Sequence, residues 1–185
     1  MFLIGKNVRL RPIHEDDLAD LYRWRNSPEA TGDYNNYQPA DWFSYEKRIK
    51  SMGESPTEVA MFMIEKKDDR KKIGYAVHFV AHPLFRSVEI GYSVCEPDER
   101  GKGYATEAAG LLVDHLFSVR NIARIQATTS TKNAPSQRVL EKCGFKKEGV
   151  MRDNSFERGK LGDDYLYSIV RSDWMQAQGS AASRT

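Results

Sequence analysis

A basic, glycine-rich turn is the segment of this sequence whose residue types point most clearly to chemistry. The turn lies between a predicted strand over 87–95 and the start of a predicted helix over 104–119, and it consists of Arg100, Gly101, Lys102, Gly103, Tyr104 and Ala105. Its two glycines leave room for a ligand to approach the backbone closely. The first amides of a helix lack helical partners and lie at the positive end of the helix dipole. The turn therefore suits a pyrophosphate, and its two basic side chains add positive charge.

Other phosphate-binding patterns do not match this turn. The sequence lacks the G-x-x-x-x-G-K-[ST] pattern of P-loop proteins, and the glycines do not belong to a G-x-G-x-x-G pattern followed by an acidic residue. A G-x-G pair by itself is equally compatible with a structural turn that only begins a core helix. Further residues are needed to choose between a ligand site and such a turn.

The hydrophobic pattern predicts the elements that would position this turn. Strands are expected over 8–11, 59–66, 72–81, 87–95, 123–129, 145–151 and 165–170, and helices over 14–26, 41–52, 104–119 and 134–142. This order is not a simple alternation of strands and helices. It predicts an α/β fold with a mixed sheet of about seven strands and helices on both faces. We expect one domain over 1–175 and a disordered tail over 176–185.

Composition excludes several classes of protein. The 185-residue chain carries a formal charge of +2, which gives no reason to expect nucleic acid or a membrane surface as a partner. No apolar run approaches the roughly 20 residues of a membrane span, so a cytoplasmic protein is expected. Cys95 and Cys143 lie in apolar surroundings and are expected to be reduced core thiols. The four histidines form no metal-ligand pattern, and no metal is expected.

Two motifs together resemble the signatures of the GNAT superfamily of N-acetyltransferases. Residues 100–105 match R/Q-x-x-G-x-G/A, and residues 133–145 are similar to N-x-x-S-x-R-x-x-E-K-x-G-F, about 30 residues further along. The Asn-x-x-Ser form of the second motif, residues 24–26 and residues 162–165 are most similar to the RimJ/RimL branch, which includes acetylases of ribosomal-protein N-termini. The resemblance covers roughly residues 6–174 and implies a GNAT-like, largely antiparallel sheet.

The resemblance implies that acetyl-CoA binds as co-substrate along the strand over 87–95. Backbone amides near Tyr92, Ser93 and Val94 would hold the pantetheine arm and the thioester oxygen, where a donor stabilises developing negative charge. The pyrophosphate would lie on the amides of residues 100–105. Asn133 would bond the pantetheine arm; its type also suits a helix N-cap, and both roles can hold at once.

The expected reaction is direct attack of a neutral amine on the thioester in a ternary complex. Glu89 lies on the strand beside the thioester and is the candidate general base, with a solvated or paired strand carboxylate as the alternative. Many GNAT enzymes protonate the leaving thiolate with a tyrosine seven residues after the motif asparagine, but that position holds Leu140. The RimL-like pattern substitutes Ser136, whose alternative is a plain first-turn helix serine. Ser155 stands where some RimL-type enzymes carry a glutamate.

The acceptor is expected to be a primary amine, and the aromatic-rich segment over 30–45 is the candidate wall of its pocket. Tyr34, Tyr37 and Trp42 either line that pocket or pack as a loop onto the core. The resemblance points to a protein N-terminal α-amine. The alternatives are a small-molecule amine, such as an amino sugar, an antibiotic or an amino acid, and a non-catalytic CoA-binding module. Leu140 and Ser155, which replace the tyrosine and the glutamate, favour the non-catalytic module. Glu89 and Ser136 argue against it, because they could carry catalysis. A monomer or a homodimer is expected.

Overall fold

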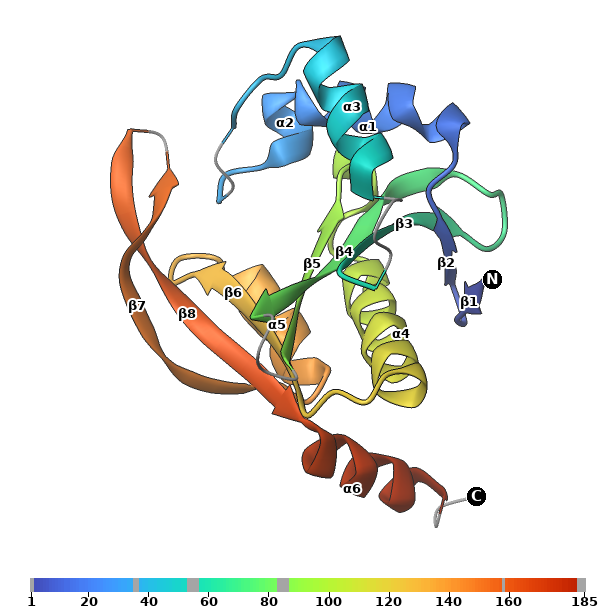
Figure 1. Cartoon of the computed structure of the whole chain (residues 1–185), viewed down its shortest axis with the longest axis vertical. Coiled ribbons are helices and arrows are strands. Elements are labelled where there is room, and N and C mark those ends of the chain that lie inside the picture. Colours follow the sequence, from blue (N-terminus) through green and yellow to red (C-terminus); the bar gives the residue numbers. More distant parts are fainter. Residues whose placement is uncertain (1, 35–36, 53–56, 83–86, 158, 183–185) are drawn as a thin grey trace.

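The fold is built on one sheet whose strands come from nearly the whole length of the chain (Figure 1). The computed structural model describes residues 2–34, 37–52, 57–82, 87–157 and 159–182. The strands are β1 (Leu3–Ile4), β2 (Val8–Pro12), β3 (Val59–Lys66), β4 (Lys72–His82), β5 (Ser87–Val94), β6 (Arg124–Ser130), β7 (Lys146–Glu157) and β8 (Lys160–Val170). The helices are α1 (Leu18–Arg25), α2 (Pro28–Thr31), α3 (Trp42–Met52), α4 (Tyr104–Val119), α5 (Ala134–Lys142) and α6 (Arg171–Ala182), and short 3-10 turns cover Glu15–Asp17 and Pro97–Glu99.

The sheet confirms the predicted fold class, with one more strand than expected. Its order is β1-β2-β3-β4-β5-β6-β8-β7. The additional strand is β1, which pairs with β2 but has two residues and so cannot give a hydrophobic alternation. Neighbouring strands run antiparallel with one exception, the parallel pair β5 and β6.

The parallel pair is short, and this shapes the middle of the sheet. Residues 87–89 of β5 pair with residues 124–126 of β6. Beyond Glu89 the two strands diverge, because β5 stays paired with β4 as far as Val94 and β6 stays paired with β8 as far as Ser130. A gap therefore opens between β5 and β6, next to the loop that leads into α4.

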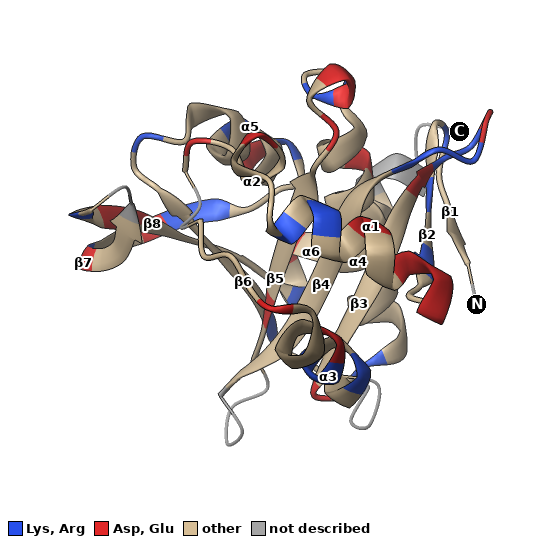
Figure 2. Cartoon of the chain, turned by 90° about the horizontal axis from the view of Figure 1, so that it is seen from above, with Lys and Arg blue, Asp and Glu red and all other residues tan. Residues whose placement is uncertain are grey.

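Helices cover both faces of the sheet, as predicted (Figure 1). The apolar stripe of α4 packs on one face, where Ala108, Leu112 and Leu116 are fully buried. On the other face α1 and α3 bury Leu21, Trp24 and other apolar side chains in a second core. The solvent side of α3 carries both basic and acidic residues (Figure 2), the amphipathic pattern of a surface helix.

A buried ion cluster holds the segment before α1 against the sheet. Arg11 of β2 donates two hydrogen bonds to Asp17, at 2.6 and 2.8 Å, and a third to Glu65 of β3. Lys72 of β4 lies 2.8 Å from the same Asp17 carboxylate. Asp17 is fully buried, so removing a partner would leave a buried charge uncompensated, a change that typically costs about 3–5 kcal/mol.

Strands β7 and β8 form a long hairpin that rises from the sheet toward the side of α2 (Figure 1). The paired residues run from Lys146 opposite Ser168 to Glu157 opposite Lys160, with register shifts along β7. Both strands extend further toward the turn than the predicted 145–151 and 165–170. The distal half of the hairpin lacks an apolar run, so its sequence does not stand out as a strand.

Helix α6 covers most of the segment from residue 176 onward that was predicted as a tail. Trp174 Nε1 and Gln178 Nε2 both donate to Asp114 of α4, at 2.7 and 3.0 Å. The Trp174 ring also stacks on Phe117, with 5.3 Å between ring centroids. These contacts join segments about 60 residues apart in the chain, which is why no local pattern indicates them. Residues 183–185 of the predicted tail lie outside the described residues.

Candidate active site

The predicted phosphate turn has the backbone of an anion-binding helix start. Gly101 and Gly103 have φ angles of +76° and +87°, a region that favours glycine, and Gly103 is the N-cap of α4. A Cβ added at either glycine would meet nothing within 4 Å, so the space above the turn is open. The first helical bond runs from the Glu107 amide to the Gly103 carbonyl. The amides of residues 104–106 are therefore left without a helical partner.

The two basic side chains of the turn bind protein groups instead of extending freely over it. Arg100 Nε donates to the Val94 carbonyl at 2.9 Å, and Arg100 Nη2 donates to the carbonyls of Glu29 and Ala30 at 2.9 and 2.7 Å. Lys102 Nζ pairs with Glu99 at 2.9 Å and does not line the cleft described below. Hydrogen bonds from Lys71 and Lys102 lower the pKa of Glu99 to about 2. The open backbone amides, more than these side chains, are what the turn offers an anion.

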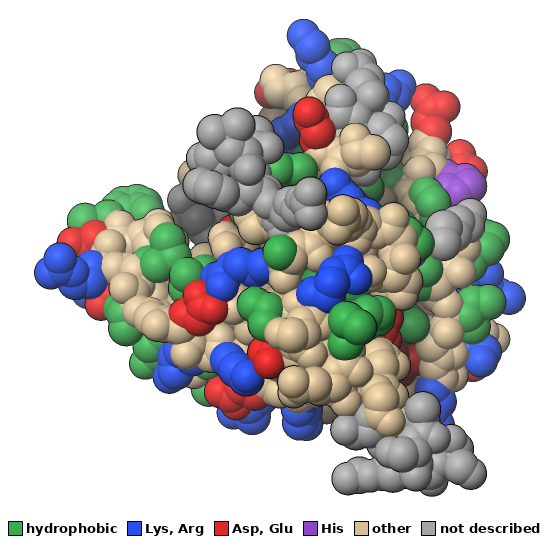
Figure 3. All heavy atoms as spheres, turned by 60° about the horizontal axis from the view of Figure 1, so that its bottom comes forward, with side chains coloured by type: hydrophobic (Ala, Val, Ile, Leu, Met, Phe, Trp, Pro, Cys, Tyr) green, Lys and Arg blue, Asp and Glu red, His purple; other side chains and the backbone are tan. Residues whose placement is uncertain are grey.

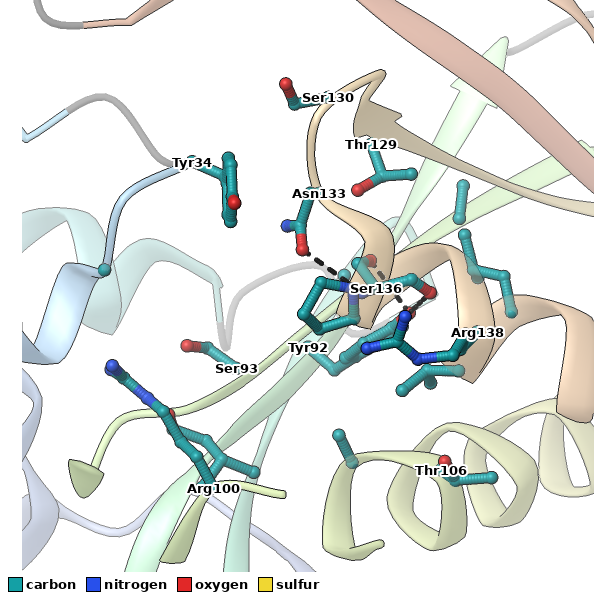
Figure 4. A pocket seen from close by; sticks show the side chains of 18 of the residues that line it. Tyr34, Tyr92, Ser93, Arg100, Thr106, Thr129, Ser130, Asn133, Ser136 and Arg138 are labelled. Atoms are coloured by element: carbon teal, nitrogen blue, oxygen red, sulfur yellow. Dashed lines mark hydrogen bonds between the residues drawn. The ribbon is translucent and has the colours of Figure 1, made fainter. Parts of the chain in front are cut away.

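A cleft of about 770 Å³ occupies the gap between β5 and β6 and reaches the phosphate turn. It brings together nearly all the residues predicted to bind the cofactor: Tyr92, Ser93, Val94, Arg100, Gly101, Gly103, Tyr104, Ala105, Asn133 and Ser136. Figure 4 shows Ser93 and Arg100 on one side of this space and Asn133 and Ser136 on the other. The two sequence motifs thus form opposite walls of one cleft.

Asn133 and Ser136 are joined by the start of α5. Asn133 Oδ1 accepts a hydrogen bond from the Ser136 amide at 3.1 Å, so Asn133 is the helix N-cap and its amide nitrogen is left for other partners (Figure 4). The Ser136 hydroxyl lies 3.2 Å from the Tyr92 hydroxyl, which also donates to the Ser136 carbonyl at 3.3 Å. Burial raises the pKa of Tyr92, so the phenol stays protonated. Leu140 is buried in the main core.

Glu89 occupies the last paired position before β5 and β6 diverge, opposite Gln126. Gln126 Nε2 donates to one carboxylate oxygen at 3.0 Å, and Thr128 Oγ1 donates to the other at 3.1 Å. Glu89 itself does not line the cleft, whereas Thr128 does. The predicted base therefore lies behind a threonine hydroxyl at the closed end of the gap.

The family of the chain follows from a match that includes both walls of this cleft. The model of the acetyltransferase (GNAT) domain matches residues 7–146. The chain belongs to the GNAT acetyltransferase family. The matched range includes the phosphate turn and both diverging strands. Membership confirms the prediction of an N-acetyltransferase that was based on the two motifs.

Relatives and solved structures agree with this assignment. YnaD of Bacillus subtilis (strain 168), an uncharacterized N-acetyltransferase, is 31% identical over 179 residues that cover 94% of this chain and 99% of YnaD. Mycobacterium smegmatis RimJ in complex with CoA-disulfide is 28% identical, with a TM-score of 0.78 and coverage of 90% of this chain and 83% of RimJ. Vibrio cholerae spermidine N-acetyltransferase in complex with CoA and spermine has the same fold, with 21% identity, a TM-score of 0.81, and coverage of 92% and 99%.

Of the three aromatic residues predicted for the acceptor pocket of this GNAT enzyme, one lies at the cleft and two lie elsewhere. Tyr34 lines the cleft and is partly exposed (Figure 4). The Tyr37 hydroxyl donates to the Asn26 carbonyl at 3.2 Å, and Trp42 packs edge-on against Tyr22 with 5.1 Å between centroids. Neither of these two lines the cleft, and Trp42 packs against the second core. Trp42 thus fits the alternative prediction, in which this segment packs onto the core.

The β7–β8 hairpin contributes cleft residues that the sequence did not indicate as acceptor contacts. Ser155, Phe156 and Asp164 line the same cleft as Tyr34. Ser155 is a position that the resemblance singled out, whereas Phe156 and Asp164 take their place from the pairing of the hairpin, for which no local signal exists. Thr128 was also missed, although the polar alternation of Gln126, Thr128 and Ser130 along β6 is a signal that one face of this strand is not core.

The remaining reactive groups do not suggest other chemistry. Cys95 is buried and Cys143 is half-buried, and burial raises the pKa of both thiols to about 11, so neither is a thiolate near neutral pH. No group of three or more metal-ligating side chains lies together among the described residues.

None of the described helices is long and apolar enough to cross a bilayer.

Proposed function

We propose that this GNAT enzyme transfers the acetyl group of acetyl-CoA to a primary amine by direct attack in a ternary complex. The observation that carries the proposal is the single cleft that runs from the free amides of the phosphate turn into the gap between β5 and β6. An extended pantetheine arm can use the unpaired edge of β5 as an added strand would, and the pyrophosphate then meets the start of α4.

Several of the predicted cofactor residues would have a role in this arrangement. The amides of residues 92–94 would bond the pantetheine arm and, at the thioester, stabilise the charge that develops on its oxygen. The side-chain oxygen of Asn133 caps α5, and its side-chain nitrogen, Nδ2, would donate to the pantetheine arm from the opposite wall. Arg100 would act by holding the turn and α2 in place.

Proton transfer would use groups at the two sides of the thioester. Glu89 would accept a proton from the acceptor amine, and Ser136, backed by the Tyr92 hydroxyl, would give a proton to the departing thiolate. The neutral nitrogen attacks the carbonyl carbon, and the carbon–sulfur bond breaks as Ser136 protonates the sulfur. The second proton of the attacking nitrogen then returns to Ser136. The products are an amide and the CoA thiol, and Glu89 releases its proton to solvent. An α-amine, with a pKa of about 7.7–8.0, needs less help from a base than a lysine near 10.4.

We propose a protein N-terminal α-amine as the first acceptor class. The RimJ/RimL-like motifs support it, and so does the modest base catalysis that an α-amine requires. A small polyamine is the second candidate, because the Asp164 carboxylate is almost fully buried in the cleft wall and suits a cationic acceptor. The spermidine N-acetyltransferase with bound CoA and spermine has the same fold.

The test is CoA thiol release from acetyl-CoA with separate acceptors. The acceptors are short peptides with a free N-terminus, the same peptides with a blocked N-terminus and an internal lysine, and spermidine. We expect thiol release and a mass gain of one acetyl group with the free N-terminus. Release with spermidine alone would favour the second candidate. If none of these acceptors gives release although acetyl-CoA binds, the alternatives that remain are another small-molecule amine and the non-catalytic CoA-binding module.

A further inference from the structure

The placement of Glu89 poses a problem for its role as base. Its carboxylate does not line the cleft where an acceptor amine would meet the thioester. Thr128 is among the β6 residues that do line the cleft, and its hydroxyl donates to Glu89 Oε1 at 3.1 Å. A hydroxyl can accept one proton while it donates another. Thr128 is therefore suited to connect the carboxylate with the cleft.

The strand geometry supports this connection. Glu89 and Gln126 face each other at the last paired position of β5 and β6, and Thr128 is two residues further along β6, on the same side of that strand as Gln126. Thr128 thus stands on the β6 wall where the gap begins. This is the closed end of the space that the pantetheine arm would enter, where the thioester would lie.

We propose that the Thr128 hydroxyl relays a proton from the acceptor ammonium to Glu89. The ammonium gives a proton to Thr128 Oγ1 as the hydroxyl proton of Thr128 moves to Glu89 Oε1. The amine becomes neutral, the threonine is unchanged and the carboxylate becomes a carboxylic acid, so atoms and charge balance. The relay rests on the proposed acetyl transfer, in which Glu89 is the base.

The second partner of Glu89 fits the relay. Gln126 Nε2 holds the other carboxylate oxygen at 3.0 Å, which fixes the orientation of the carboxylate. Both partners of Glu89 are neutral, and a neutral partner opposes an arriving proton less than a lysine or arginine would. Gln126 is thus a positioning residue, and Thr128 is the group that would touch the acceptor.

The competing explanation is that these three side chains only brace β5 against β6. Thr128→Val keeps the shape of the side chain and removes the hydroxyl, whereas Thr128→Ser keeps the hydroxyl. With the best acceptor, we expect Thr128→Val to lower kcat about tenfold, with the KM for acetyl-CoA within twofold of wild type, and Thr128→Ser to recover most of that loss. Thr131→Val, at a threonine outside the cleft lining, is the matched control and should behave as wild type.

A double-mutant cycle separates a relay from a brace. If Thr128 acts through Glu89, Thr128→Val should cause no further loss of kcat in a Glu89→Gln background. A full tenfold loss in that background would overturn the relay. So would a Thr128→Val enzyme that unfolds at a lower temperature yet keeps the wild-type kcat. Absence of thiol release by the wild-type enzyme would overturn acetyl transfer itself. If the wild-type enzyme is active and Thr128→Val has the same kcat, the relay alone is overturned.

Discussion

At the scale of the residue, the phosphate turn presents backbone amides, and side chains hold that backbone in place. The glycines at 101 and 103 adopt left-handed backbone conformations that leave the amides at the start of α4 open. Arg100 looks in the sequence like an anion ligand, yet its guanidinium bonds the carbonyls of Val94, Glu29 and Ala30. One side chain thus joins the end of β5, the turn and α2.

Replacing Arg100 tests this role. Arg100→Ala should destabilise the fold by about 1–2 kcal/mol, because three carbonyls lose a charged donor, and should raise the KM for acetyl-CoA because the turn is no longer held. Arg100→Lys should not restore either property, since one ammonium cannot reproduce the planar fork. Urea unfolding and steady-state kinetics measure the two effects. An Arg100→Lys enzyme equal to wild type would show that charge alone matters.

At the scale of the element, two features build the cleft: the divergence of β5 from β6 and the β7–β8 hairpin. The hairpin places Phe156, about half exposed, in the cleft lining. Its cross-strand partner Leu161 is also exposed but does not line the cleft. The hairpin therefore places one exposed aromatic residue at the cleft and a matched exposed apolar residue away from it.

This pair gives a prediction for acceptor binding. Phe156→Ala should raise the KM for the acceptor several-fold, because an aromatic contact is lost, and should leave the KM for acetyl-CoA within twofold. Leu161→Ala should change neither constant. Both positions are exposed, so the unfolding midpoints of the two variants should stay close to wild type. Equal effects of the two substitutions on acceptor KM would show that Phe156 does not contact the acceptor.

At the scale of the whole molecule, the surface is mixed in charge while several ionisable groups are buried. The face in Figure 3 mixes Lys and Arg with Asp and Glu and scattered hydrophobic side chains. Inside, burial together with Arg120 and His115 lowers the pKa of His78 to about 4. Burial acts to raise the pKa of Asp17, but hydrogen bonds from Arg11, Lys72 and the His14 amide outweigh it and hold that pKa well below its usual range.

These shifts predict how stability depends on pH. The unfolded chain protonates His78 near its usual pKa of about 6.5, so the free energy of unfolding should fall as pH drops from about 6.5 to 4, by up to about 3 kcal/mol. Below about pH 4, Asp17 becomes protonated in the unfolded chain at a higher pH than in the folded protein. The free energy of unfolding should therefore fall further. Urea unfolding at a series of pH values measures both phases. His78→Gln should reduce the upper phase, and an unchanged upper phase would contradict the role of His78.

The sequence predicts the parts of this fold that depend on local patterns. The phosphate turn, the helix over 104–119 and the asparagine that caps α5 lie where their residues indicated. The role of Arg100, the length of the hairpin and helix α6 were not predicted, because each depends on contacts between distant segments. The segment with Trp42 is instructive, since a rigid aromatic suits both a pocket and a core, and tertiary packing decides between them.

The central claim is that acetyl-CoA binds on the turn at the start of α4, and thermal unfolding with and without acetyl-CoA tests it most directly. Wild type should gain about 2.7 kcal/mol in unfolding free energy at a ligand concentration of one hundred times Kd. Gly103→Val should lose that gain, because a branched side chain is strained at the +87° φ angle and would fill the open space above the turn that the pyrophosphate would occupy. Gly110→Ala, in the middle of α4 and outside the cleft lining, should keep it. No gain in wild type at saturating acetyl-CoA, or an equal gain in Gly103→Val, would contradict the claim.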